Sequence, residues 1–164
     1  DKGQYLTDII RDEAIAFIGR NKANPFFAYL AFNAIHTPLH ANQGYLDRVA
    51  NLKDGKHKML AAMTVALDDA VGAVVKTVKD AGLERDTLFV FLSDNGSPIM
   101  TGAGTNAPLN GEKVSYYEGG IRVPMIVAWK GRVPVGEDVS GDRRFARFAA
   151  DVFESGGRGE RGEV

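Results

Sequence analysis

The chain has 164 residues, of which 45% are hydrophobic and 25% charged, with a formal net charge of −1 and no cysteine. This composition is typical of a globular unit or of part of a larger one, and the balanced charge gives no argument for a nucleic-acid or membrane partner. The missing cysteine excludes disulfides, thiolate metal sites and a cysteine nucleophile within these residues. No apolar run is long enough to span a bilayer, and no secretory leader opens the chain. Because the chain starts at Asp1 without a methionine, we expect further sequence upstream.

Two amphipathic helices are predicted. The first covers residues 7–19, with Thr7 or Asp8 as its N-cap and an apolar face made of Ile10, Ala14, Phe17 and Ile18. The second is longer, because apolar residues recur every three or four positions, and Gly82 stands where a helix C′ glycine belongs. Its apolar positions are Leu60, Met63, Leu67, Val71, Val74 and Val78.

Three runs of β-forming residues, 26–32, 87–92 and 123–129, are predicted to be strands. The long helix lies between the first two, and the order strand, helix, strand favours a parallel crossover. The predicted fold class is therefore α/β, with a doubly wound, mixed or mostly parallel sheet flanked by helices. The glycine-rich stretch 96–122 is predicted to be a long functional loop.

Asp94 and Asn95 directly follow the strand at 87–92. Ligands of open α/β sheets gather at the carboxyl ends of the strands, and carboxylate and amide oxygens bind Ca²⁺ or Mg²⁺. The pair is therefore a candidate metal site. The alternative is an Asx-turn that closes the strand, which the sequence Asp-Asn-Gly favours by itself.

His36 and Lys113 occupy two further loops that we expect at the same edge of the sheet. Together with a metal ion they would make a cationic pocket for a tetrahedral oxyanion. Lys113 would supply a point charge, and His36 would give a proton to a departing alkoxide. The alternatives are a histidine that hydrogen-bonds locally and a lysine that is solvated.

Two charged pairs have other expected roles. Asp68 and Asp69 are neighbours on a helix and diverge, so one is expected at the surface while the other stays open to a supporting role. Glu118 and Arg122 flank two glycines and are expected to fix the loop that carries Lys113 through a salt bridge.

These residues lie in motifs that resemble those of the type I sulfatases, a family of the alkaline-phosphatase superfamily. The motifs are P-F-F-A-Y-L (25–30), A-I-H-T-P (34–38), L-D-x-x-V-G (67–72), F-L-S-D-N-G (91–96), N-A-P-L-N-G-E-K (106–113) and Y-E-G-G-I-R-V-P (117–124). They keep the order and spacing of the family, and the resemblance covers residues 5–135.

The resemblance implies a role for each candidate residue. Asp94 and Asn95 would be two ligands of an active-site Ca²⁺, Lys113 would bind and neutralise the sulfate, and His36 would hydrogen-bond the ester and protonate the leaving group. The implied reaction is hydrolysis of an aryl or carbohydrate sulfate monoester. The implied compartment is periplasmic, secreted or lysosomal.

The chain also departs from the family. The family's nucleophile is a formylglycine made from Cys or Ser in a C/S-x-P-x-R motif, and no such motif occurs here. A further aspartate pair of the metal site, with another Lys and His, normally precedes the matching region. We therefore expect residues 1–140 to be the later part of a sulfatase catalytic domain that alone binds Ca²⁺ poorly and turns over nothing. The alternatives are a phosphodiesterase or phosphonate hydrolase of the same superfamily, and a non-catalytic remnant.

Residues 141–164 do not continue the family's pattern. They are rich in arginine and glycine and are predicted to form a disordered tail. One permissible set of codons for residues 142–153, read one nucleotide later, encodes S-L-D-L-L-P-T, which resembles the family's segment at this point. We hypothesise a frameshift near residues 139–142. Codons in the gene that are incompatible with the shifted reading would refute it.

Overall fold

The computed structural model describes residues 4–53 and 55–136. The chain divides into two units, residues 1–133 and 134–164, and every helix and strand below belongs to the first. The tail predicted at 141–164, with its frameshift hypothesis, lies outside the described residues. Within residues 4–53 and 55–136, no helix combines the length and the apolar character that crossing a membrane requires.

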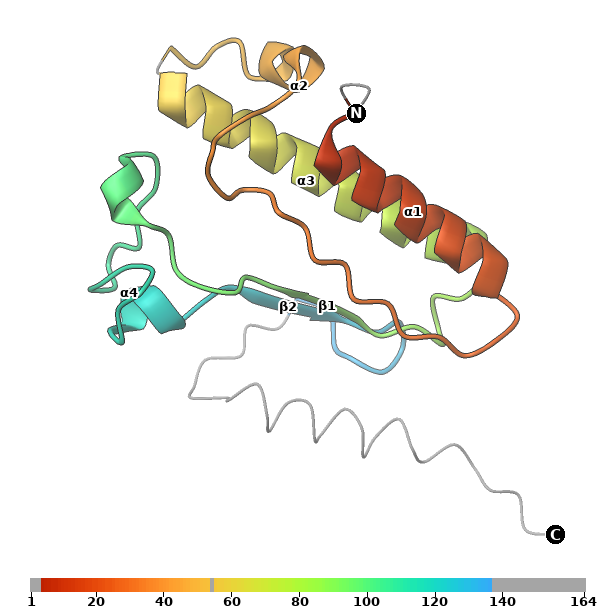
Figure 1. The fold of residues 1–164 in the computed structure, drawn as a ribbon. Coiled ribbons are helices and arrows are strands. Elements are labelled where there is room, and N and C mark those ends of the chain that lie inside the picture. Colours follow the sequence, from red (N-terminus) through yellow and green to blue (C-terminus); the bar gives the residue numbers. More distant parts are fainter. Residues whose placement is uncertain (1–3, 54, 137–164) are drawn as a thin grey trace, which may run out of the picture. The chain divides into compact units, whose positions relative to one another are not determined.

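Both predicted helices are present, and they run side by side as α1 (Leu6–Asn21) and α3 (Gly55–Asp80) (Figure 1). The buried row on α3 repeats every four residues and contains three alanines, each 0% exposed. Small side chains on this row let neighbouring segments approach the helix closely. The leucines of the predicted face, at 60 and 67, are only half-buried. The buried residues of α3 are Ala62, Met63, Ala66, Ala70, Val74 and Val78.

The ends of the two helices differ in how well the sequence predicted them. The N-cap of α1 is Tyr5 rather than Thr7 or Asp8, so the cap prediction is wrong: the backbone is still extended at Tyr5, and the helix begins before either residue. The end of α3 is as predicted, because Gly82 has φ +74° and its N–H donates to the Lys79 carbonyl. Together with the bond from Leu83 N to Val78 O, this is a Schellman motif.

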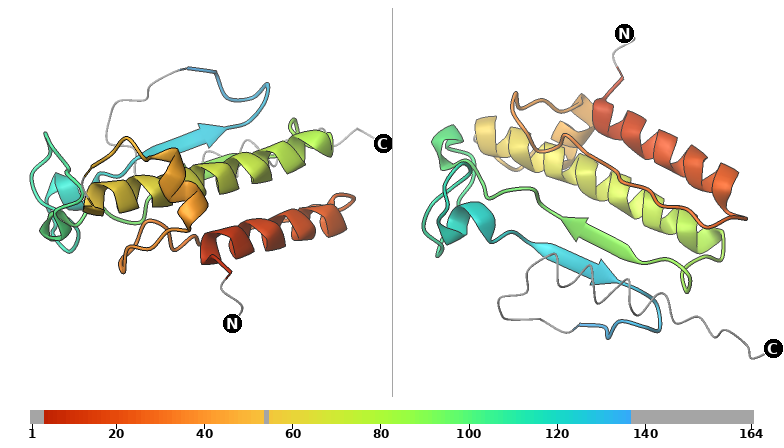
Figure 2. Two further views of the ribbon diagram at one scale, coloured as in Figure 1. Left: turned by 90° about the horizontal axis from the view of Figure 1, so that it is seen from above. Right: turned by 60° about the horizontal axis from the view of Figure 1, so that its bottom comes forward.

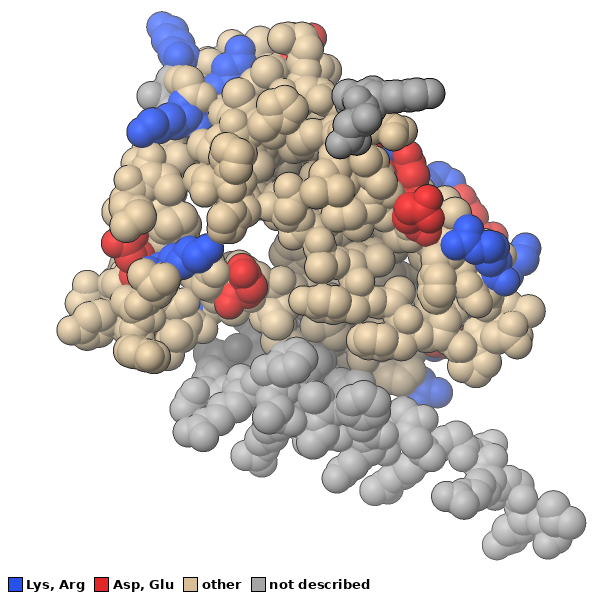
Figure 3. Space-filling view, in the orientation of Figure 1, with Lys and Arg blue, Asp and Glu red and all other residues tan. Residues whose placement is uncertain are grey.

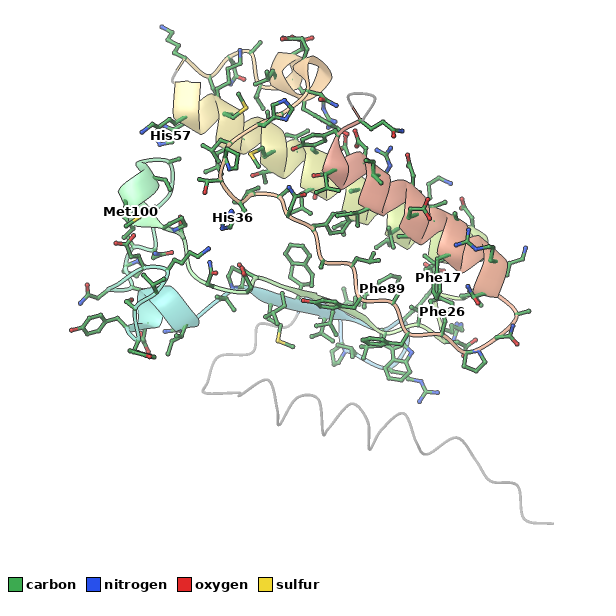
Figure 4. All side chains as sticks on the ribbon, viewed as in Figure 1. Phe17, Phe26, His36, His57, Phe89 and Met100 are labelled. Atoms are coloured by element: carbon green, nitrogen blue, oxygen red, sulfur yellow. The ribbon has the colours of Figure 1, made fainter. Side chains whose placement is uncertain are left out.

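Two apolar clusters hold the helices in place. In the first, buried side chains of α1 and α3 meet half-buried ones that include Phe17, Phe26 and Phe89, labelled in Figure 4; the Phe17 and Phe26 rings pack edge to face at 5.7 Å. In the second, the short helix α2 (Gln43–Arg48) and the segment before it pack on the first half of α3.

The sheet has two strands among the described residues, β1 (Phe89–Leu92) and β2 (Met125–Ala128). They correspond to the centres of the predicted strands at 87–92 and 123–129. They pair antiparallel, with Phe89 opposite Ala128 and Leu92 opposite Met125, as the two arrows of Figure 2 show. Just beyond β2, the indole N–H of Trp129 donates to the Arg85 carbonyl at 2.7 Å.

The strand predicted at 26–32 is not formed. The segment is extended, with Phe26 and Leu30 packed on the first apolar cluster and Phe27 and Tyr29 more than 80% exposed. Exposed and half-buried side chains alternate along residues 29–34 as in a strand, although Ala28 is exposed as well. No other strand pairs with the segment within the described part of the chain. A strand needs a partner for its N–H and C=O groups, and the parallel crossover expected from this segment to β1 is likewise not seen.

The long loop at 96–122 contains two single-turn helices, η1 (Ile99–Thr101) and α4 (Glu118–Ile121). The structure otherwise leaves this stretch without regular secondary structure, as predicted.

Candidate functional site

The structure brings His36 and Lys113 into direct contact, although 77 residues separate them in the chain. The Nζ atom of Lys113 lies 3.0 Å from Nε2 of His36, and Nδ1 of His36 lies 2.6 Å from the Thr37 carbonyl oxygen. A carbonyl can only accept, so Nδ1 carries the hydrogen and Nε2 accepts from the lysine. His36, labelled in Figure 4, is exposed, and Lys113 is half-buried, so the pair is open to a ligand from solution.

A tight turn presents Lys113. The Ser115 N–H donates to the Glu112 carbonyl at 3.0 Å, which places Lys113 and Val114 at the two central positions. Val114 has φ +68°, a value that glycine adopts freely and a β-branched residue does not. The Ser115 hydroxyl closes the turn a second time, since it donates to the Glu112 carbonyl and accepts from the Glu112 N–H.

Glycines pack the loops of the site against one another. The Gly96 N–H donates to the Gly120 carbonyl at 2.9 Å, and a Cβ at Gly96 would lie 1.7 Å from the Gly119 carbonyl oxygen. A Cβ at Gly119 would lie 2.3 Å from the Gly111 carbonyl oxygen. These positions therefore need glycine because no side chain fits there, and the loop after β1 is pressed onto the loop that carries Lys113.

Asp94 and Asn95 follow β1 as predicted. Within the described residues the exposed Asp94 carboxylate has no hydrogen-bond or ion-pair partner, while the half-buried Asn95 uses its Nδ2 on the Gly96 carbonyl. A free carboxylate and an amide oxygen suit Ca²⁺, but this ion takes six to eight oxygens. In the described part of the chain, no group of three or more acidic, His or Cys side chains could hold a metal ion. The residues fit a partial site, and their role as ligands stays a prediction.

One aspartate of the helical pair is at the surface and the salt bridge at 118–122 is formed, both as predicted, whereas the loop-fixing role of that bridge and a supporting role for the second aspartate stay predictions. Asp68 is exposed, and Asp69 accepts a hydrogen bond and an ion pair from Arg48 on α2. Glu118 and Arg122 form an ion pair at 3.6 Å on α4. Because about two thirds of each of these last side chains is exposed, the pair contributes little to stability.

A polar cluster fixes the loop that follows His36. The Tyr5 hydroxyl donates to the His40 carbonyl at 3.1 Å, and the Tyr45 hydroxyl donates to Oδ1 of Asp8 at 2.6 Å. Asp8 also pairs with Arg11 at 2.8 Å. Burial and the bond to Asp8 raise the pKa of Tyr45 to about 12, so the phenol stays protonated and keeps donating at neutral pH.

Side chains of both charges are exposed on the face of the molecule that Figure 3 shows. In the face shown by Figure 3, Lys and Arg side chains alternate with Asp and Glu and do not gather into one continuous basic area.

Sequence reasoning missed the residues that support the site. Asn106 was seen only as part of a motif and Ser115 not at all, yet their side chains make the bonds that shape the loop. Tyr5 and Tyr45 were not singled out either. A single sequence gives little signal for such residues, because a polar residue in a glycine-rich loop has the same pattern whether it faces water or another loop.

Comparison with known proteins shows which family the chain belongs to. The sequence model of the sulfatase family matches residues 1–154, and the chain belongs to that family. A solved structure, "Crystal structure of Ps i-CgsB in complex with k-i-k-neocarrahexaose", aligns with a TM-score of 0.76 and 43% identity, over 81% of this chain and 30% of that one. The fold is accordingly of the predicted α/β, alkaline-phosphatase-like type, whereas the predicted doubly wound sheet is not seen in the described residues, whose sheet has two antiparallel strands.

The chain is also similar to two curated sulfatases. N-acetylgalactosamine-6-sulfatase of Sus scrofa is 34% identical over 137 residues, which cover 80% of this chain and 25% of the relative. A sulfatase of Formosa agariphila is 36% identical over 145 residues, which cover 78% of this chain and 25% of that protein. The chain spans about a quarter of the length of these relatives.

Proposed function

We propose that this chain forms part of the catalytic domain of a sulfatase, which hydrolyses sulfate monoesters to an alcohol and inorganic sulfate. The observation that carries the proposal is the 3.0 Å contact between His36 and Lys113. Two basic side chains meet only where something outweighs their repulsion or where one of them is neutral. In this contact Nε2 of His36 accepts from the lysine, and an anion bound beside the pair would compensate the charge of the lysine.

The pair can handle one sulfate group in two ways. Of the three N–H donors of the Lys113 ammonium, one goes to His36, and the other two, with the positive charge, remain for the non-bridging oxygens. Nε2 of His36 accepts from Lys113 in this structure, so it would first have to take up a proton; it could then give that proton to the ester oxygen as the bond to sulfur breaks. Since the Thr37 carbonyl holds Nδ1, the ring is oriented with Nε2 toward the ligand.

Asp94 and Asn95 would hold part of a Ca²⁺ site, or of a Mg²⁺ site. When bound, the ion would polarise a sulfate oxygen and add positive charge to the site. Two ligands out of six or more bind such an ion weakly, so we expect poor Ca²⁺ binding by this chain alone. The sequence also lacks the motif that yields formylglycine, and we therefore assign its residues binding and proton transfer only and expect no turnover by the chain itself.

For the substrate we propose a sulfated carbohydrate. One relative is named for N-acetylgalactosamine 6-sulfate chemistry, and the aligned solved structure is a complex with a neocarrahexaose. Both fit a sugar sulfate as the substrate. No comparison favours a phosphodiesterase or phosphonate hydrolase.

We further propose that residues 26–33, β1 and β2 belong to a doubly wound, mostly parallel sheet of the whole enzyme. The alternating exposure along residues 29–34 and the alkaline-phosphatase type of fold support this. A structure of a longer protein that contains this chain tests it: ladder hydrogen bonds along 26–33 are expected, and their absence would refute it.

The proposed function is tested by titrating the chain with inorganic sulfate. The NMR chemical shifts of the His36 ring and of the Lys113 side chain are measured at each sulfate concentration. We expect saturable shifts of both groups and about a tenfold weaker Kd for Lys113→Ala, the loss of one charge-assisted hydrogen bond. The exposed Lys22→Ala serves as control and should leave the Kd unchanged. Equal weakening by both variants, or no shift at either group, would overturn the site.

Two further arms address the reaction and its specificity. Inorganic phosphate should bind no more tightly than sulfate; the reverse order would favour the phosphate-ester alternative. An aryl sulfate and a sulfated oligosaccharide should both be left intact by the chain. Clear turnover that is lost in Lys113→Ala would refute the expectation that the chain alone is inactive.

A further inference from the structure

Asn106 has no assigned role, and its carboxamide makes three hydrogen bonds. Its Oδ1 accepts from the Ser97 N–H at 2.8 Å, and its Nδ2 donates to the Ser97 carbonyl at 2.8 Å and to the Gly111 carbonyl at 3.1 Å. The two bonds to Ser97 imitate the pairing of one residue in a strand. The third reaches the residue two positions before Lys113.

These bonds join two loops with different predicted tasks. Ser97 follows the segment of Asp94 and Asn95, the predicted metal ligands, whereas Gly111 leads into the turn of Lys113. An amide is needed here, because the same group must accept once and donate twice within a fixed plane. Asn106 is half-buried, so water replaces these bonds less easily than at a fully exposed residue.

We propose that Asn106 is a positioning residue that ties the loop of Asp94 and Asn95 to the loop of Lys113. It sets the separation between the metal side and the anion side of the site without touching the substrate. The inference rests on the proposed function for its consequence in binding, but the tie itself is a property of the loops and is measured independently.

Amide hydrogen exchange of the full chain tests the tie. Asn106→Ala should raise the exchange rate of the Ser97 amide about tenfold, the loss of one hydrogen bond. It should also raise the rate of Gly96, whose amide donates to Gly120 across the two loops, and of Gly119, whose amide donates to Asn110 within the Lys113 loop. Asn106→Asp keeps the acceptor for Ser97 and removes both donors. Ser97 should then stay protected while Gly119 does not. If Asn106→Ala speeds the amide exchange of Ser97 alone, or of none of these residues, the proposed link between the two loops is refuted.

Sulfate affinity tests the consequence. Asn106→Ala should weaken the sulfate Kd several-fold while His36 and Lys113 remain in place. Asn51→Ala, an exposed asparagine outside these loops, should not. Ala14→Gly in α1 lowers stability without touching the site and should also leave the Kd unchanged. An unchanged Kd in Asn106→Ala, when the wild-type chain binds sulfate, would overturn the positioning role.

The two arms separate the two proposals. A wild-type chain that binds no sulfate refutes the proposed anion site and the positioning role together, whereas the exchange experiment still decides whether Asn106 joins the loops.

Discussion

Replacing Val114 by glycine should stabilise the protein, because this residue is held at φ +68° at the second central position of the Lys113 turn. A left-handed conformation costs a residue with a Cβ about 1–2 kcal/mol. The side chain is 90% exposed, so its removal forfeits only about 0.2 kcal/mol of apolar burial, a tenth of the value for a fully buried valine.

The greater freedom of glycine in the unfolded chain opposes the gain by about 0.5–1 kcal/mol. The net stabilisation is then about 0.5 kcal/mol, or a rise in Tm of about 1–2 °C for a chain of this size. Thermal and urea unfolding of the wild type, Val114→Gly and Val114→Ala measure it. Alanine removes the same methyl groups but keeps the Cβ, so it should not stabilise. A glycine variant no more stable than the alanine variant would refute the strain argument.

Two further outcomes follow from the contacts. Gly96→Ala should destabilise by about 2 kcal/mol or more, because its Cβ would meet the Gly119 carbonyl at 1.7 Å; the control Gly19→Ala, which meets nothing within 4 Å in α1, should stabilise by up to about 1 kcal/mol. Urea unfolding measures both, and equal effects would contradict the packing. Tyr45→Phe should cost about 1 kcal/mol at pH 7, since the bond to Asp8 is lost. Because the pKa of Tyr45 is raised from 10 to about 12, its contribution is complete below pH 10 and disappears as the pH passes 12. A difference between wild type and variant that persists above pH 12 would contradict this.

The features that sequence analysis predicted correctly depend on local pattern. The helix α3 follows from apolar residues three and four apart, and its end follows from Gly82, since only a few residues decide each. The helix α1 was found but its cap was not, because the start of a helix depends on where the preceding backbone turns.

The features that were predicted wrongly or missed depend on contacts with distant segments, which a local sequence pattern does not specify. The run 26–32 has the composition of a strand, yet a strand exists only where another segment pairs with it. His36 and Lys113 were expected in loops at one edge of the sheet, and the structure brings the two side chains together in a direct contact that was not predicted. Asn106 could not be found in this way, since its importance comes from which backbone groups happen to face it.

The single tryptophan gives the molecule a natural optical probe. Trp129 bonds to the Arg85 carbonyl at the end of β2, and the Arg132 guanidinium lies 4.7 Å from its ring centroid, so its fluorescence reports on the strand pair. Far-ultraviolet circular dichroism reports instead on α1 and α3, which contain most of the helical residues. Unfolding followed by both signals therefore shows whether the helices and the strands melt as one cooperative body, and superimposable curves would mean that they do.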